Sequence, residues 1–147
     1  MPPGNQETGK MTGTMKPFSQ PIPLRARVFG WVLVAAGCFF AWVYMAAPGG
    51  FFPGVTVETF SERFGLYSTG VRILGSVVGI VIALALNSAA LLALMLATRI
   101  FIELGDVLVG LVLNGGPDAN TVTLTVLAAV ELYMLVFLLG RIRASQT

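Results

Sequence analysis

Three charged residues within one otherwise apolar stretch limit most strongly what this chain can fold into. Arg99, Glu103 and Asp106 interrupt the run from Leu91 to Leu113, which has no other charged residue, no proline and no asparagine. Their spacings of four and three residues place them on one face of an α-helix. A charged side chain near the centre of a bilayer costs about 3 kcal/mol or more, so it normally faces a partner or a water-filled cavity. The run therefore predicts a membrane-spanning helix whose charged face is turned toward other helices.

The overall composition supports a membrane protein of one domain. Hydrophobic residues make up 56% of the 147 residues and charged residues 11%, whereas soluble proteins have about 25% charged residues. The apolar residues come in blocks long enough to cross a bilayer. Basic residues flank these blocks and form no patch with aromatic residues, so we expect no nucleic-acid partner.

Several kinds of active site are excluded by residue type. The chain has one cysteine, Cys38, and no histidine. A disulfide within one chain, a Cys/His zinc site and a histidine-based nucleophile system therefore cannot form. No metal-ligand set or phosphate-binding loop is present, so the sequence predicts no catalytic residue and identifies no cofactor. An enzyme that uses a glutamate or aspartate as general acid or base stays open.

The blocks predict an all-α membrane protein with four transmembrane helices. Residues 1–24 are rich in Pro, Gly, Thr and Met and predict a disordered cytoplasmic tail. Residues 25–143 form the predicted transmembrane domain, and 144–147 a short cytoplasmic tail. The four predicted spans cover about 26–47, 70–86, 89–113 and 122–139.

The segment between the first two spans is too polar to cross a membrane. Apolar residues recur there at helical spacing, namely Val57, Phe60, Phe64 and Tyr67. Thr59 and Glu62 fit a capping box, although Thr56 is an equally good start. The pattern predicts a short amphipathic helix in the interface, with a solvated loop as the alternative.

Glycines in the second span predict close helix packing. Gly75 and Gly79 form a GxxxG motif, and Gly70 extends the same row of small residues. Such a row lets another helix approach closely in a membrane. If the protein forms a homodimer, we expect this row to be its interface.

Basic residues predict the orientation of the four spans. Because an even number of spans returns the chain to its starting side, both termini share that side. Most basic residues flanking the spans lie there: Lys10, Lys16, Arg25, Arg27, Arg141 and Arg143. The positive-inside rule then predicts cytoplasmic termini, most simply in a plasma or bacterial inner membrane.

Five intramembrane charges can be placed by depth, using a rise of 1.5 Å per residue. This placement predicts that Arg99 pairs with Glu103 and Glu131, and that Arg72 pairs with Asp106. Two arginines against three carboxylates leave one buried negative charge, which is costly. We therefore expect Glu131 or Glu103 to carry a proton for part of the time, unless a cation or a protonated ligand group neutralises it. Alternatively, the pairs lock the helices together and have no chemical role.

The charged segments resemble those of a known group of proteins. The resemblance rests on GVRILGSVVG around Arg72, TRIFIELGDVLVGL in the third span, the LNGG turn and AAVELYML around Glu131. It covers about residues 26–140 and points to the DoxX-like group of small four-helix membrane proteins, above all its domain-of-unknown-function families. The resemblance implies a four-helix bundle and supplies no reaction. Some DoxX-like proteins take part in quinone-linked or thiol redox systems, but this chain has no cysteine pair.

Three functions are compatible with these features. The first is the binding of a lipid, isoprenoid or quinone within the bundle, with Arg99, Glu103, Asp106 and Glu131 at its polar end. This function predicts a pocket that reaches Glu131. The second is a proton-coupled carrier of a small molecule. The third is an accessory subunit of a larger membrane complex, for example a redox complex.

Overall fold

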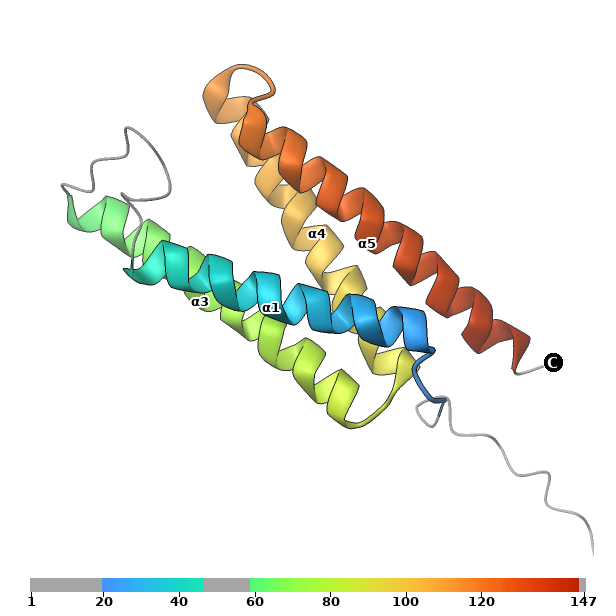
Figure 1. The fold of residues 1–147 in the computed structure, drawn as a ribbon. Coiled ribbons are helices and arrows are strands. Elements are labelled where there is room, and N and C mark those ends of the chain that lie inside the picture. The colour runs from blue at the N-terminus through green and yellow to red at the C-terminus, as the bar shows by residue number, and fades with distance from the viewer. Residues whose placement is uncertain (1–19, 47–58, 146–147) are drawn as a thin grey trace, which may run out of the picture.

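The computed structural model describes residues 20–46 and 59–145, and the ordered elements in this part of the chain are all helices. They are α1 (Leu24–Ala46), α3 (Phe60–Ala85), α4 (Ala89–Asn114) and α5 (Ala119–Ala144) (Figure 1). Each contains one of the four predicted spans, apart from Leu86, which caps the end of α3, and residue 47, which lies outside the described residues. The predicted helical class is therefore confirmed.

The helices associate as two antiparallel pairs. α1 packs mainly against α3, and α4 packs mainly against α5. The contact between α3 and α4 is less extensive. The two pairs meet near the turn between α3 and α4 and diverge away from it (Figure 1). All four helices contribute to the core at that meeting point, through residues such as Leu33, Ile80, Leu92 and Leu138. The charged residues of α4 lie further along the helix, where the pairs separate.

Three of the four helices are long and apolar enough to cross a membrane, namely α1, α3 and the segment Thr121–Ala144 of α5. By the same measure α4 does not qualify, although it is as long as its neighbours. The reason lies in its sequence, because Arg99, Glu103 and Asp106 interrupt its apolar run. The structure thus indicates a membrane protein with one helix of unusual charge.

The predicted interfacial helix is not a separate element among the described residues. Phe60, Phe64 and Tyr67 instead form the first two turns of α3, which continues without a break into the second span. The capping box was correctly placed, since the Thr59 hydroxyl accepts from the Glu62 backbone N–H and the Glu62 carboxylate accepts from that of Thr59. Helical spacing is the same in an interfacial and a spanning helix, so the pattern could not separate them. Val57, the first residue of the predicted pattern, lies outside the described residues.

The predicted glycine row on α3 does not form a single packing face. A Cβ at Gly70 would meet Met45 of α1 at 2.5 Å, and one at Gly79 would meet Met95 of α4. At Gly75 no atom of the described residues lies within 4 Å of the added atom. Gly70 and Gly79 therefore allow close packing against different helices, whereas the packing role of Gly75 stays a prediction.

Residues near the α1 start belong to the folded part of the chain, which shortens the predicted tail. Ile22 is buried, and its backbone N–H donates to Asn87 Oδ1 at 3.1 Å. Arg27 donates to the same oxygen at 2.5 Å. Asn87 has a φ of 49°, a left-handed value that asparagine tolerates better than most residues. Its side chain thereby ties the α3–α4 turn to the start of α1. Residues 1–19 lie outside the described part.

Candidate functional site

The register of α4 and α5 brings their charged residues together. A Cβ at Gly110 of α4 would lie 2.6 Å from the Thr121 side chain of α5, so the two helices come close at this point. Thr121 also belongs to the capping box that starts α5 at Asp118. Because the helices are antiparallel, moving back along α4 to Arg99 corresponds to moving forward along α5 to Glu131. The cap and the close approach together set this register.

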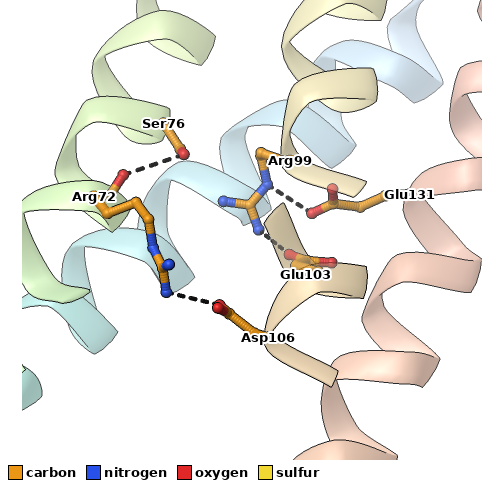
Figure 2. A network of polar contacts seen from close by, with 6 residues as sticks. All are labelled: Arg72, Ser76, Arg99, Glu103, Asp106 and Glu131. Carbon is orange, nitrogen blue, oxygen red and sulfur yellow. Dashed lines mark hydrogen bonds and ion pairs between the residues drawn. The ribbon is translucent and has the colours of Figure 1, made fainter. Parts of the chain in front are cut away.

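Arg99 is the centre of an ionic cluster between α4 and α5. Its Nε donates to Glu131 Oε1 at 2.8 Å, and its Nη2 donates to Glu103 Oε1 at 2.7 Å. Glu103 is four residues further along the same helix, where side chains face one another. Figure 2 shows the guanidinium beside both carboxylates, with Glu131 reaching in from α5. The pairing of Arg99 with these two glutamates is confirmed.

The cluster is buried and its hydrogen bonding is incomplete. The side chains of Arg99, Glu103 and Glu131 are 11%, 8% and 0% exposed. Within the described residues, Glu103 Oε2 and Glu131 Oε2 are buried and have no hydrogen-bond partner. A buried acceptor without a donor costs about 1–3 kcal/mol, and more when it is charged. One guanidinium also leaves one of two ionised carboxylates uncompensated.

A second ion pair links the two helix pairs. Arg72 Nη2 of α3 lies 2.7 Å from Asp106 Oδ2 of α4, which confirms the predicted pairing. These side chains are 44% and 33% exposed, so they are far more accessible than the Arg99 cluster. In Figure 2 the Arg72 side chain extends from α3 toward α4, and its backbone oxygen accepts from the Ser76 hydroxyl. The five predicted residues thus form two groups.

Tyr44 of α1 is a neighbour of the second ion pair that the sequence reasoning missed. Its half-buried phenol is within electrostatic range of Asp106 and Arg72. In the sequence, Tyr44 looks like an aromatic residue at the membrane interface. The depth of Tyr44 in the membrane could have indicated that it lies near this ion pair, because Tyr44 is in the last turn of α1 and α1 runs antiparallel to α3.

The cluster offers acid–base and hydrogen-bonding chemistry. No set of three metal-ligating side chains is found among the described residues. Two carboxylates can accept hydrogen bonds, hold a proton or balance a cationic group, while the guanidinium fixes their positions.

One cavity among the described residues lies away from Glu131. It has a volume of about 430 Å³ and lies between α1 and α3, where its lining is almost entirely apolar and includes Cys38, Trp42, Tyr67 and Leu74. None of the five ionisable residues lines it. Since Glu131 is fully buried, any molecule can contact it only after side chains or helices move.

Comparison of the chain with models of known protein families, with curated proteins and with solved structures finds no match. The DoxX-like resemblance therefore rests on the residues that suggested it and remains a hypothesis.

Proposed function

We propose that the chain is a four-span membrane protein that binds a small apolar or amphipathic molecule within its bundle. In this proposal α4 also crosses the membrane, as the third of four spans along the chain. Its charges are compatible with a membrane because each of them is paired with a neighbouring residue. Leu96 and Ile100 are buried on the same side of α4 as Arg99 and Glu103, so the cluster has apolar neighbours along its own helix.

The proposed orientation places both termini in the cytoplasm, most simply at a plasma or bacterial inner membrane. Arg25 and Arg27 begin α1, and Arg141 and Arg143 end α5. The Gln20 side chain donates to the Ser145 hydroxyl, so these two ends of the bundle lie together. Four exposed arginines at one end agree with the positive-inside rule.

One observation carries the binding proposal, namely the two buried carboxylate oxygens without a partner in the Arg99 cluster. A purely architectural cluster would be expected to satisfy its buried acceptors, because each unmet one opposes folding. A bound molecule that satisfies them gains affinity from the same groups. Glu103, Glu131 and Arg99 would hold its polar end, and Asp106 with Arg72 would border the site.

A proton-coupled carrier is the second candidate, and the charge count favours it specifically. One guanidinium between two carboxylates leaves a negative charge that a proton can neutralise. A carrier would exchange this proton for its substrate. A four-span chain that does so would be expected to work as a dimer.

Native mass spectrometry of protein extracted gently from its own membranes tests the proposal. We expect a lipid-like, isoprenoid-like or quinone-like molecule bound to the protein, and its loss from the Glu131→Gln and Arg99→Gln variants. Circular dichroism establishes that the variants keep their helices. Protein that carries no such molecule, or that carries it equally in both variants, contradicts the binding proposal. A second polypeptide in the spectrum would instead support an accessory subunit.

A further inference from the structure

The unmet hydrogen-bonding groups of the Arg99 cluster identify the chemistry of a complementary ligand. Arg99 uses one donor on Glu131 Oε1 and another on Glu103 Oε1. While both glutamates are ionised, the remaining oxygens, Glu103 Oε2 and Glu131 Oε2, are both acceptors. Both side chains are more than nine-tenths buried, so bulk water does not hydrate these oxygens freely. These two glutamate oxygens therefore need hydrogen-bond donors.

The net charge of the Arg99 cluster gives a second requirement for the ligand, namely a positive charge. The Arg72–Asp106 pair is neutral and outside the cluster, so the cluster itself contains one cation and two carboxylates. With both carboxylates ionised, one positive charge is needed for balance. Uncompensated charge in a low-dielectric site is costly, and a cationic group that enters the site removes that cost.

These two requirements separate the candidate ligand classes. A quinone carbonyl is only an acceptor, and a carboxylate or phosphate headgroup would add a second negative charge. An alcohol donates one hydrogen bond but brings no charge. A protonated primary or secondary amine supplies at least two N–H donors and one positive charge, and so meets both requirements.

We propose that the Arg99 cluster binds an amphipathic amine in its protonated form, whose ammonium group donates to Glu103 Oε2 and Glu131 Oε2. This inference rests on the proposed binding function and specifies its ligand class. The apolar part of the amine would lie among the aliphatic residues that continue the cluster's faces. On α4 these are Leu96 and Ile100, and on α5 they are Ala128 and Leu138, one turn before and two turns after Glu131.

A proton competes with the amine for the same two oxygens. Protonation of either glutamate removes the charge and the acceptor that the ammonium requires, so the affinity falls as the pH is lowered. The charged or titratable groups around the glutamates are Arg99 on α4 and the Arg72–Asp106 pair between α3 and α4. Tyr44 on α1 is near that pair, and the exposed Tyr133 on α5 is the remaining titratable side chain close to Glu131 in sequence.

A matched set of probes tests the ligand class. Dodecylamine, dodecyltrimethylammonium, dodecanol and dodecanoate share one apolar chain and differ in charge and donors. Each is titrated into the purified protein in phosphatidylcholine nanodiscs by calorimetry, with empty nanodiscs to correct for partitioning. A quinone with a decyl tail is titrated in parallel. The variants are Glu103→Gln and Glu131→Gln. The control is Asp118→Asn, which removes a carboxylate from the same helix pair but keeps a good N-cap.

We expect dodecylamine to bind at least about tenfold more tightly than the other three probes, since charge-assisted hydrogen bonds contribute about 1.5–3 kcal/mol. Both glutamine variants should lose at least about tenfold in amine affinity, while Asp118→Asn should match the unmodified protein. The affinity of the unmodified protein should also fall at low pH, a readout that does not depend on the folding of any variant. Dodecylamine binding that is weak, unchanged by both variants or independent of pH overturns the amine assignment. If the quinone or dodecanoate binds and requires Arg99, the amine assignment fails while the binding function stands. If no probe binds, the amine assignment fails and the extraction experiment decides the binding function separately.

Discussion

Removing Arg99 should destabilise the protein far more than removing Arg72. The Arg99 side chain is 11% exposed and makes charge-assisted hydrogen bonds of 2.8 and 2.7 Å to two buried carboxylates. Arg99→Gln leaves both carboxylates in a low-dielectric site without their counterion. Breaking a buried ion pair by removing one partner costs about 3–5 kcal/mol, so we expect a loss of this size in the free energy of unfolding.

Arg72→Gln is the matched control for this prediction. Arg72 also pairs with a carboxylate, at 2.7 Å, but its side chain is 44% exposed and that of Asp106 is 33% exposed. Measured hydrogen bonds between membrane helices contribute about 0.6 kcal/mol on average. A freed aspartate at this accessible position can also be hydrated. We therefore expect Arg72→Gln to cost about 1 kcal/mol or less.

The assay is reversible unfolding of both variants in mixed micelles of mild detergent and dodecyl sulfate, followed by circular dichroism at several pH values. Lowering the pH should narrow the difference between Arg99→Gln and the unmodified protein, because protonation removes the negative charges that have lost their partner. Adding Glu103→Gln and Glu131→Gln to Arg99→Gln should restore most of the stability, since no buried charge then remains. Equal losses for the two arginine variants, or no recovery in the triple variant, would refute the reasoning.

Three further predictions concern the scaffold that positions the cluster, and each is measured by the same unfolding assay. Gly37→Ala should lower the free energy of unfolding by about 1–3 kcal/mol, because the new methyl group would be forced against Val77. Gly75→Ala should be tolerated, because no atom of the described residues lies near the added methyl group. Similar losses for the two variants would show that the helices pack differently. Thr59→Ala should lower the free energy of unfolding by about 1 kcal/mol through loss of the α3 cap. Thr59→Ser should retain most of the stability that the cap contributes. Asn87→Ala should cost about 1–3 kcal/mol because it removes the oxygen shared by two donors; an unchanged stability would contradict this link between the α3–α4 turn and α1.

The ion pairs could be predicted because helical geometry is regular. A fixed rise per residue and antiparallel neighbours convert sequence position into depth, and depth alone matched Arg99 with Glu131 and Arg72 with Asp106. Opposite charges in an apolar setting also have few alternatives, since an unpaired one is costly. The structure confirms these contacts. It leaves the ligand or proton role of the five residues as a prediction.

Features that depend on rotation about a helix axis could not be predicted in the same way. Gly70, Gly75 and Gly79 form a row in the sequence, yet α3 lies between α1 and α4 and turns Gly70 and Gly79 toward different neighbours. Gly37 of α1, which packs against Val77, was missed because a single glycine in an apolar span gives no signal of its partner. Asn87 lies between two predicted spans, and only the folded position of Ile22 and Arg27 reveals the link that it makes.

An experimental structure of the protein extracted from its own membranes would test the central claim most directly. We expect density for a bound molecule with a polar group within hydrogen-bond distance of Glu103 Oε2 and Glu131 Oε2. A structure in which both oxygens accept hydrogen bonds only from the protein itself would contradict it, because the cluster would then be complete without a ligand.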